Sequence, residues 1–360
     1  MRVYNFSAGP SALPLKVLER ARDEIVDFGG CGMSIMEMSH RSETYEAVAQ
    51  RAEVLLRKLF AVPKNYHVLF LQGGATAQFA AVPLNITGTH RRAAYVNTGI
   101  WSAKAIAEAG RYLDEVLIAA STEASGFNRV PEAGEWVDTG PVDYVHYTDN
   151  ETIGGVEFSS IPASGDAPLV CDMSSNILSR VVDVSRYGLI YAGAQKNMGP
   201  SGITVVIVRE DLLGAARPET PSFMNYAIQA KNGSMLNTPP TYPWYLLGLV
   251  LEWLDEQGGV KAMEALNSKK SALLYEALDN SDLFSNPVAV GSRSRMNIPF
   301  TLSRPELEAL FLEEARQAGL VNLEGHRSVG GFRASLYNAM PYAGVSALVS
   351  FMSDFERRHG

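Results

Sequence analysis

The chain has very little cysteine: Cys31 and Cys171 are the two among 360 residues. They have neither the spacing of metal ligands nor the density of a disulfide scaffold. Long apolar runs are also missing, since stretches such as residues 245–251 are much shorter than the roughly 20 residues that cross a bilayer. Residues 1–11 contain no apolar core of signal-peptide length. These absences predict a cytoplasmic protein with no membrane segment and no metal centre.

Positive charge is scarce as well. The chain has 31 lysines and arginines against 39 aspartates and glutamates, which gives a net charge of −8 at pH 7. An acidic chain is a poor partner for nucleic acid and for an anionic membrane, so we expect neither. Its 46% apolar and 19% charged residues are ordinary for a folded protein. Because 360 residues exceed what one hydrophobic core usually organises, we expect two domains.

Strand and helix patterns alternate over the first two thirds of the chain. Short apolar runs predict strands at residues 67–71, 92–97, 115–118, 143–147, 169–172, 189–192 and 203–208. Apolar residues at three- and four-residue spacing predict helices at residues 14–27, 43–60, 76–85, 102–110 and 242–257. Strands separated by helical crossovers imply a mostly parallel, buried sheet.

The pattern changes near Gly258. Beyond it, helices are predicted at residues 260–280, 305–318 and 344–357, with strands at residues 296–300 and 332–335. We therefore predict a large domain, residues 15–257, and a small α/β domain that consists of residues 258–360 together with the N-terminal segment 1–14. The tract at residues 210–243 is rich in Pro, Asn and Thr and is long and irregular, and such a loop is usually functional.

A single lysine, Lys196, stands among small residues in Ala192-Gly193-Ala194-Gln195-Lys196-Asn197, just ahead of an apolar strand. Asp172 ends another predicted strand. A buried lysine lowers its pKa readily and forms Schiff bases, and a carboxylate suits a pyridinium nitrogen. Lys196 and Asp172 together suggest a site for pyridoxal 5'-phosphate (PLP). The alternative is an ordinary lysine in a surface loop.

A second feature is the strand-to-helix turn Gln72-Gly73-Gly74-Ala75-Thr76. The first N–H groups of a helix have no internal acceptor, and glycines allow a phosphate to approach them. The alternative is a plain tight turn in which Thr76 caps the helix. The turn lacks the lysine of a P-loop and the spacing of a dinucleotide fingerprint. It therefore suits a small phosphorylated cofactor.

Seven loop motifs along the chain carry one resemblance. They are Asn5-Phe6-Ser7-Ala8-Gly9-Pro10, Ser39-His40-Arg41-Ser42, Gln72-Gly73-Gly74-Ala75, Asp172-Met173-Ser174-Ser175, Gly193-Ala194-Gln195-Lys196-Asn197, Asn237-Thr238-Pro239-Pro240 and a last segment from Gly330 to Ala339. In this order they resemble the phosphoserine aminotransferase family, PLP enzymes of fold type I in aminotransferase class V. The resemblance covers nearly the whole chain. It implies a mostly parallel seven-stranded sheet flanked by helices, plus a smaller C-terminal α/β domain.

The resemblance also implies roles for the polar residues of these loops. Lys196 would hold PLP and shuttle a proton, Asp172 would pair with the pyridinium N–H, and Trp101 would stack on the ring. Thr152 would bind the 3' oxygen of the cofactor. Without the resemblance, Trp101 is better interpreted as a core tryptophan. The phosphate contacts would come from Ala75, Thr76 and Gln195 and, across a homodimer interface, from the partner subunit's copies of Asn237 and Thr238.

Cations would select the substrates. A phosphorylated amino acid and a dicarboxylic keto acid each carry two anionic ends, which arginine binds bidentately. Arg333 matches the family's α-carboxylate arginine. Taken singly, each of these cations is also consistent with a solvated surface charge. The cluster for the phosphate or distal carboxylate is matched by His40, Arg41, His326 and Arg327.

Two positions depart from some relatives. Thr76 stands where some members have arginine, and Ala8 stands where some have serine. These differences concern substrate affinity more than reaction type.

The activity implied by the resemblance is a ping-pong amino transfer. Glutamate and 3-phosphohydroxypyruvate would give 2-oxoglutarate and phosphoserine, a step of serine biosynthesis. In the family the same site also handles a phosphorylated hydroxythreonine in pyridoxine biosynthesis, which the residues here leave open. A PLP lyase or cysteine desulfurase would need a reactive cysteine, for which neither Cys31 nor Cys171 is well placed. A non-catalytic phosphate-binding α/β protein would need no Lys196.

Overall fold

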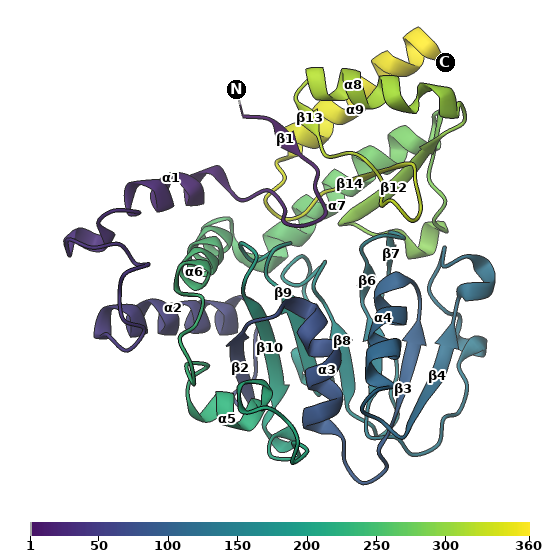
Figure 1. Cartoon of the computed structure of the whole chain (residues 1–360). Helices are drawn as coiled ribbons and strands as arrows, with labels where there is room; N and C mark the ends of the chain where they lie inside the picture. Colours follow the sequence, from purple (N-terminus) through teal and green to yellow (C-terminus); the bar gives the residue numbers. More distant parts are fainter. Residues whose placement is uncertain (1) are drawn as a thin grey trace.

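The computed structural model describes residues 2–360. A β-sheet flanked by helices forms the lower part of the molecule in Figure 1. Within these residues seven strands make up this sheet, in the order β2-β10-β9-β8-β5-β3-β4. β10 runs antiparallel to β2 and β9, and the other neighbours are parallel. The predicted, mostly parallel sheet is confirmed. The strands are β2 (Tyr66–Leu71), β3 (Arg92–Asn97), β4 (Glu115–Ser121), β5 (Val145–Thr148), β8 (Leu169–Asp172), β9 (Leu189–Gly193) and β10 (Thr204–Arg209).

Helices cover both faces of the sheet. Along β10, Val205 and Ile207 enter one apolar core and Val206 and Val208 enter the other, as the two-residue period of a strand requires. Both faces are therefore buried, which explains why the strands are apolar runs rather than alternating patterns. α2 (Glu43–Leu59) and α6 (Thr241–Glu256) contribute to the first core, with α1 (Leu15–Asp23) packed on α6. α3 (Gly74–Ile86) and α4 (Ile100–Ala109) contribute to the second.

The C-terminal third has its own core, in which phenylalanines pack edge to face: Phe284, Phe300, Phe311, Phe332 and Phe355. Its elements are α7 (Gly259–Asp279), β11 (Phe284–Ser285), β12 (Asn297–Leu302), α8 (Glu308–Gln317), β13 (Leu320–Val321), β14 (Phe332–Ser335) and α9 (Tyr342–His359). β11, β12 and β14 form an antiparallel sheet. β1 (Tyr4–Asn5) pairs with β13, which ties the N-terminal segment to this part.

Where the chain divides into domains stays a prediction, because α7 packs against both α6 and α9. The separate apolar clusters are consistent with a division near Gly258. Among residues 2–360, no helix combines the length and the apolar character needed to cross a membrane.

Two segments differ from the sequence-based expectation. The helix expected at residues 14–27 ends at Asp23, and beyond it Ile25 and Val26 are 39% and 77% exposed, so no core contact extends it. The tract at residues 210–243 is less irregular than expected. It contains α5 (Tyr226–Lys231), which buries Tyr226 and begins where the Asn225 side chain accepts a hydrogen bond from Ile228 N.

The sheet brings several loops to one edge. Because β10 is antiparallel to both of its neighbours, β2 runs in the same direction as β9, β8, β5 and β3. The carboxyl ends of these five strands therefore meet. In open α/β sheets this edge is where ligands bind.

Candidate functional site

Lys196 lies in the turn between β9 and β10, and its side chain reaches two hydroxyl groups. Nζ donates to Thr152 Oγ1 over 2.7 Å and to Ser175 Oγ over 3.0 Å. Burial lowers the pKa of Lys196 to about 8, although the negative charges of Asp172 and Glu151 raise it. A lysine with this pKa has a substantial neutral, nucleophilic fraction near neutral pH. These contacts are not those of an ordinary surface lysine.

Asp172 ends β8 beside this lysine and is 5% exposed. Ser174 donates its N–H and its hydroxyl to Oδ1, over 2.9 and 2.6 Å. Oδ2 receives no hydrogen bond from residues 2–360. Burial raises the pKa of Asp172, whereas the Lys196 charge and the Ser174 hydrogen bonds lower it. A carboxylate with one oxygen anchored and the other available fits a protonated ring nitrogen.

Trp101 and Thr152 come from neighbouring strand ends. The Trp101 ring centroid lies 5.5 Å from Lys196 Nζ, and the ring also packs on the core beneath α3 and α4. Its Nε1 is buried, with no hydrogen-bond partner in the described residues. Thr152 is buried, and its hydroxyl accepts a hydrogen bond from the Lys196 amine and also contacts the Ser175 hydroxyl. The Trp101 ring thus packs against the core and also lies near Lys196.

The turn before α3 has the form of an anion cradle. Gly73 has φ +93°, and a Cβ there would come within 2.5 Å of Ala77 Cβ, so no larger residue fits. Within residues 2–360 no side chain caps α3, which corrects the alternative in which Thr76 caps the helix. The N–H groups of Ala75 and Thr76 belong to the first turn and have no internal acceptor. They suit a phosphate.

The other predicted phosphate ligands lie at two places. Gln195 packs against Gly193, where a Cβ would come 2.5 Å from Gln195 Oε1. Asn237 lines a hollow of about 370 Å³ together with Gln72 and Gly73. Thr238 O accepts a 3.4 Å hydrogen bond from Gln72 Nε2 of the same chain. The contribution of Asn237 and Thr238 to the site of a partner subunit stays a prediction.

The predicted substrate cations form two separate groups within the chain. Arg333 on β14 donates to Thr152 O over 3.3 Å, which brings it to the lysine. His326 belongs to the same group, because burial and the charges of Arg333, Arg327 and Lys104 lower its pKa. Its Nδ1 lies 2.6 Å from Ser328 Oγ. The second group consists of His40 and Arg41, which precede α2. No hydrogen bond or ion pair within residues 2–360 joins it to the first group.

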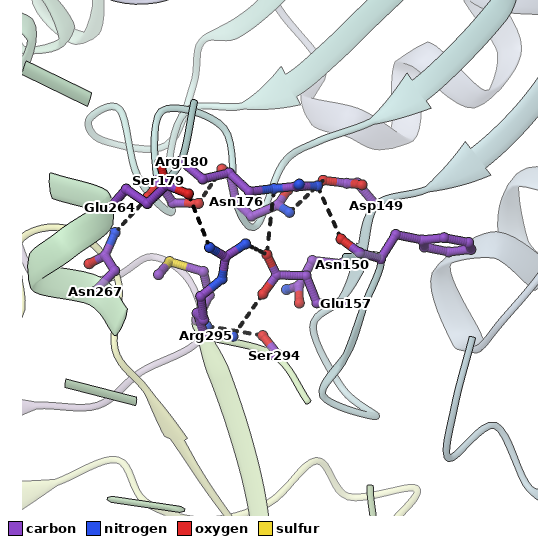
Figure 2. Close-up of polar contacts among 12 residues, drawn as sticks. Asp149, Asn150, Glu157, Asn176, Ser179, Arg180, Glu264, Asn267, Ser294 and Arg295 are labelled. Carbon is purple, nitrogen blue, oxygen red and sulfur yellow. Dashed lines mark hydrogen bonds and ion pairs between the residues drawn. The ribbon is translucent and has the colours of Figure 1, made fainter. Parts of the chain in front are cut away.

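The predicted substrate arginines differ from two other arginines near the site, which pair with carboxylates. Arg180 lies 2.7 Å from Asp149 and 3.7 Å from Glu157. Arg295 lies 2.7 Å from Glu157 and 3.5 Å from Glu264, and Figure 2 shows these side chains together. This network fixes the segments that carry Thr152 and Ser175, since the neighbouring Asn176 also donates to Asp149 over 2.6 Å. By contrast, no carboxylate of residues 2–360 lies within 4 Å of Arg41, Arg327 or Arg333. Their charge is available to an anionic ligand.

Sequence reasoning missed several of the contacts. Ser174 and Ser175 lie two and three residues after Asp172, and Glu151 directly precedes Thr152, so the available signal was their position next to predicted site residues. Lys104 lies one helical turn after Trp101, with Nζ 4.5 Å from its ring centroid.

The cysteines stand apart from this chemistry. Cys171 is fully buried, which raises the pKa of its thiol, and Cys31 is exposed in a glycine-rich loop. A thiol of raised pKa is a poor nucleophile. Within residues 2–360 no three His, Cys, Asp or Glu side chains gather as metal ligands would.

Comparison with known proteins agrees with this geometry. The family model of aminotransferase class V matches residues 3–348. The phosphoserine aminotransferase of Acinetobacter baumannii (strain ACICU) is 58% identical over 360 residues, 100% of both chains. The solved structure of the enzyme from Bacillus circulans subsp. alkalophilus has a TM-score of 0.97 at 49% identity, over 100% of this chain and 99% of that one.

A third relative was solved with the cofactor. The structure of PLP-bound phosphoserine aminotransferase from Trichomonas vaginalis has a TM-score of 0.94 at 42% identity, over 98% of this chain and 100% of that one. The match with the family model and the full-length identity both extend over almost the entire chain. The chain therefore belongs to the class V aminotransferases and, within them, to the phosphoserine aminotransferase family.

Proposed function

We propose that the protein binds PLP and transfers an amino group between glutamate and 3-phosphohydroxypyruvate, giving 2-oxoglutarate and phosphoserine. The observation that carries the proposal is the position of Lys196 Nζ, 2.7 Å from Thr152 Oγ1 and close to the buried Asp172. The family to which the chain belongs supports the same reaction. We place this activity in the cytoplasm and assign the PLP-binding residues to the large domain, residues 15–257.

Bound PLP supplies an electron sink for the charge that develops at the substrate Cα. Asp172 would keep the ring nitrogen protonated, because its negative charge and its available oxygen favour a donor there. Thr152 would bind the 3' oxygen, and the first N–H groups of α3 would bind the phosphate. The neutral amine of Lys196 would take the proton from the substrate Cα and return one in the second half-reaction.

Substrate choice follows from the cations that lack carboxylate partners. We assign the substrate α-carboxylate to Arg333, which reaches the site through Thr152 O. We assign the phosphate of phosphoserine, and the distal carboxylate of glutamate, to His326 and Arg327. His40 and Arg41 would complete this cluster from the partner subunit of a homodimer. Two positively charged groups that lie apart within one chain are explained if each site is built from residues of both chains.

Exposed apolar residues support such a dimer. In the segment between α1 and α2, Met33 and Met36 are 43% and 51% exposed, and Phe223, in the tract that holds Asn237 and Thr238, is 60% exposed. Exposed apolar side chains can mark an interface, and these lie on the two segments that carry the residues assigned to the partner's site. The dimer would carry Arg41, Asn237 and Thr238 into the neighbouring site.

The substrate assignment predicts a strong preference for a phosphorylated amino donor. We expect kcat/KM for phosphoserine to exceed that for serine or alanine at least about 100-fold, because serine and alanine lack the negatively charged group that these cations would bind. Amino transfer to 2-oxoglutarate measures it. Arg327→Gln should reduce this preference, whereas Arg186→Gln, at an exposed arginine away from the site, should not. Equal use of serine would contradict the phosphate pocket.

Cofactor loading should depend on pH. Since only the neutral amine attacks an aldehyde, the rate of PLP capture by apoprotein is expected to rise about tenfold per pH unit below the Lys196 pKa of about 8 and to level off above it. The Arg333 charge lowers that pKa, so Arg333→Gln should move the midpoint to higher pH. Stopped-flow absorbance measures the rate. A midpoint near 10.5, the ordinary value for lysine, would show that the lysine is not buried in apoprotein.

A further inference from the structure

Glu151 is a buried carboxylate that the reaction described above leaves without a role. It lies on β6 (Asn150–Glu151), which pairs with β7 (Val156–Glu157), and it is 0% exposed. A carboxylate in such a place is costly unless it is hydrogen-bonded. The side chain has no ion-pair partner within residues 2–360, so its stabilisation must come from hydrogen bonds.

All of these hydrogen bonds come from the start of α4. Oε2 accepts from Trp101 N over 3.1 Å, and Oε1 accepts from Ser102 N over 2.9 Å and from Ser102 Oγ over 2.8 Å. These N–H groups belong to the first helical turn and have no acceptor inside the helix. A negative charge at this end is also favoured by the helix dipole. Glu151 is therefore the anchor of the turn that carries Trp101.

The backbone is shaped around this carboxylate. A Cβ on Gly99 would lie 2.6 Å from Glu151 Cδ, so any residue other than glycine would displace the side chain. Ser102 Oγ in turn accepts from Thr98 N and Gly99 N, each over 2.9 Å. The start of α4 and the Glu151 side chain therefore fix each other's position.

Glu151 connects two groups that face Lys196 from different directions. Through Trp101 N it holds the residue whose ring centroid is 5.5 Å from Lys196 Nζ. Through the peptide bond it holds Thr152, whose hydroxyl is 2.7 Å from the same Nζ. Burial raises the pKa of Glu151, whereas the hydrogen bonds from Ser102 and Trp101 lower it and favour the carboxylate. The charge of this carboxylate acts on the lysine, since Asp172 and, after it, Glu151 raise the Lys196 pKa.

We propose that Glu151 is a positioning residue for the cofactor: it holds Trp101 and Thr152 in one frame and supplies, after Asp172, a second buried negative charge beside Lys196. This rests on the proposed function, in which Trp101 faces the PLP ring and Thr152 its 3' oxygen. Position and charge are separable, because aspartate keeps the charge but shortens the reach, whereas glutamine keeps the reach but removes the charge. An amide also presents N–H groups where the helix presents donors.

The test uses apoprotein of Glu151→Gln, Glu151→Asp and wild type. PLP affinity is read from the quenching of tryptophan fluorescence, and the pH midpoint of PLP capture from absorbance. Glu151→Gln should bind PLP at least about tenfold more weakly, because a displaced ring contact weakens a preorganised site. Its midpoint should fall by roughly 0.5 pH unit or more, because a negative charge near the lysine is lost. Glu151→Asp should weaken binding and leave the midpoint unchanged.

Asp183→Asn is the matched control. The Asp183 carboxylate accepts from Ser185 N and Ser185 Oγ, over 3.0 and 2.6 Å, so the same acid-to-amide change breaks the same kind of cap away from the site. It should alter neither readout. If the Glu151 variants do not fold, Ser102→Ala removes one of the three hydrogen bonds and should weaken PLP binding to a smaller degree.

The outcomes are distinct. Wild-type affinity and midpoint in both Glu151 variants would overturn the positioning role, as would equal losses in Asp183→Asn. Failure of the wild-type protein to capture PLP at all would instead overturn the proposed function, whatever the variants do.

Discussion

Replacing Lys196 with alanine is expected to lower kcat for amino transfer from phosphoserine at least about 10⁴-fold, because one group serves as both nucleophile and proton carrier. The fold should be retained, since the Asp172 carboxylate beside the lost amine keeps both of its hydrogen bonds from Ser174. The measurement is single-turnover and steady-state transfer to 2-oxoglutarate, together with the visible absorbance of the protein after PLP addition. Borohydride treatment should fix the cofactor to Lys196 in the wild type and fix none in the variant.

Two controls separate the nucleophile from the charge. Lys196→Arg keeps a cation at this position but cannot supply a neutral amine, so it should be as inactive as the alanine variant. Lys269→Ala removes an exposed lysine of α7 and should leave activity unchanged. An alanine variant that kept more than about 1% of wild-type turnover would show that another base or nucleophile performs the reaction.

A second buried lysine shows why a lowered pKa alone does not identify the nucleophile. Burial lowers the pKa of Lys270 to about 7, which is even lower than that of Lys196. Its Nζ, however, donates to the carbonyls of Leu336, Tyr337 and Met340, over 2.9 to 3.1 Å. These bonds fix the loop after β14 to α7. The neighbours of Lys196 are hydroxyls, which can accept from or donate to the amine and so suit either protonation state.

The large sheet could be predicted from the sequence because its strands are buried on both faces. Residues 92–97 and 169–172 were predicted with the bounds that the structure has, since continuous apolar runs end at polar residues there. The two-residue strands β1 and β6 were not predicted. They exist only because distant partners, β13 and β7, pair with them, and a pair of residues has no periodicity of its own.

The site was partly predictable for the same reason. Lys196 and Asp172 follow strand ends, and strand ends of a parallel sheet meet at one edge. The role of Glu151 was not predictable, because its partners Trp101 and Ser102 begin a helix about 50 residues earlier in the chain. Periodicity reports which face of an element is buried, but not which loop meets which.

Arg41→Ala is expected to lower kcat/KM for phosphoserine about 100-fold or more, because one cation that faces the substrate phosphate is removed. Figure 1 shows α1 and α2 at the β2 end of the sheet, opposite β3 and β4, and the loop between them holds Arg41. Among residues 2–360, no hydrogen bond or ion pair joins Arg41 to Arg333 or Arg327. If the dimer is as proposed, Arg41 acts in the site whose lysine belongs to the partner.

Mixed dimers test this arrangement directly. As homodimers, Lys196→Ala should be inactive and Arg41→Ala should keep about 1% or less of the wild-type kcat/KM, but a dimer with one chain of each has one site with both an intact lysine and an intact partner arginine. After subunit exchange at equal concentrations, half of the dimers are mixed and each has one working site, so activity should return to about a quarter of the wild-type value. If Arg41 acted within its own chain, neither site would be complete and mixing would restore nothing. A mixture of Lys196→Ala with Lys196→Arg, in which no chain supplies the amine, should stay inactive in both cases.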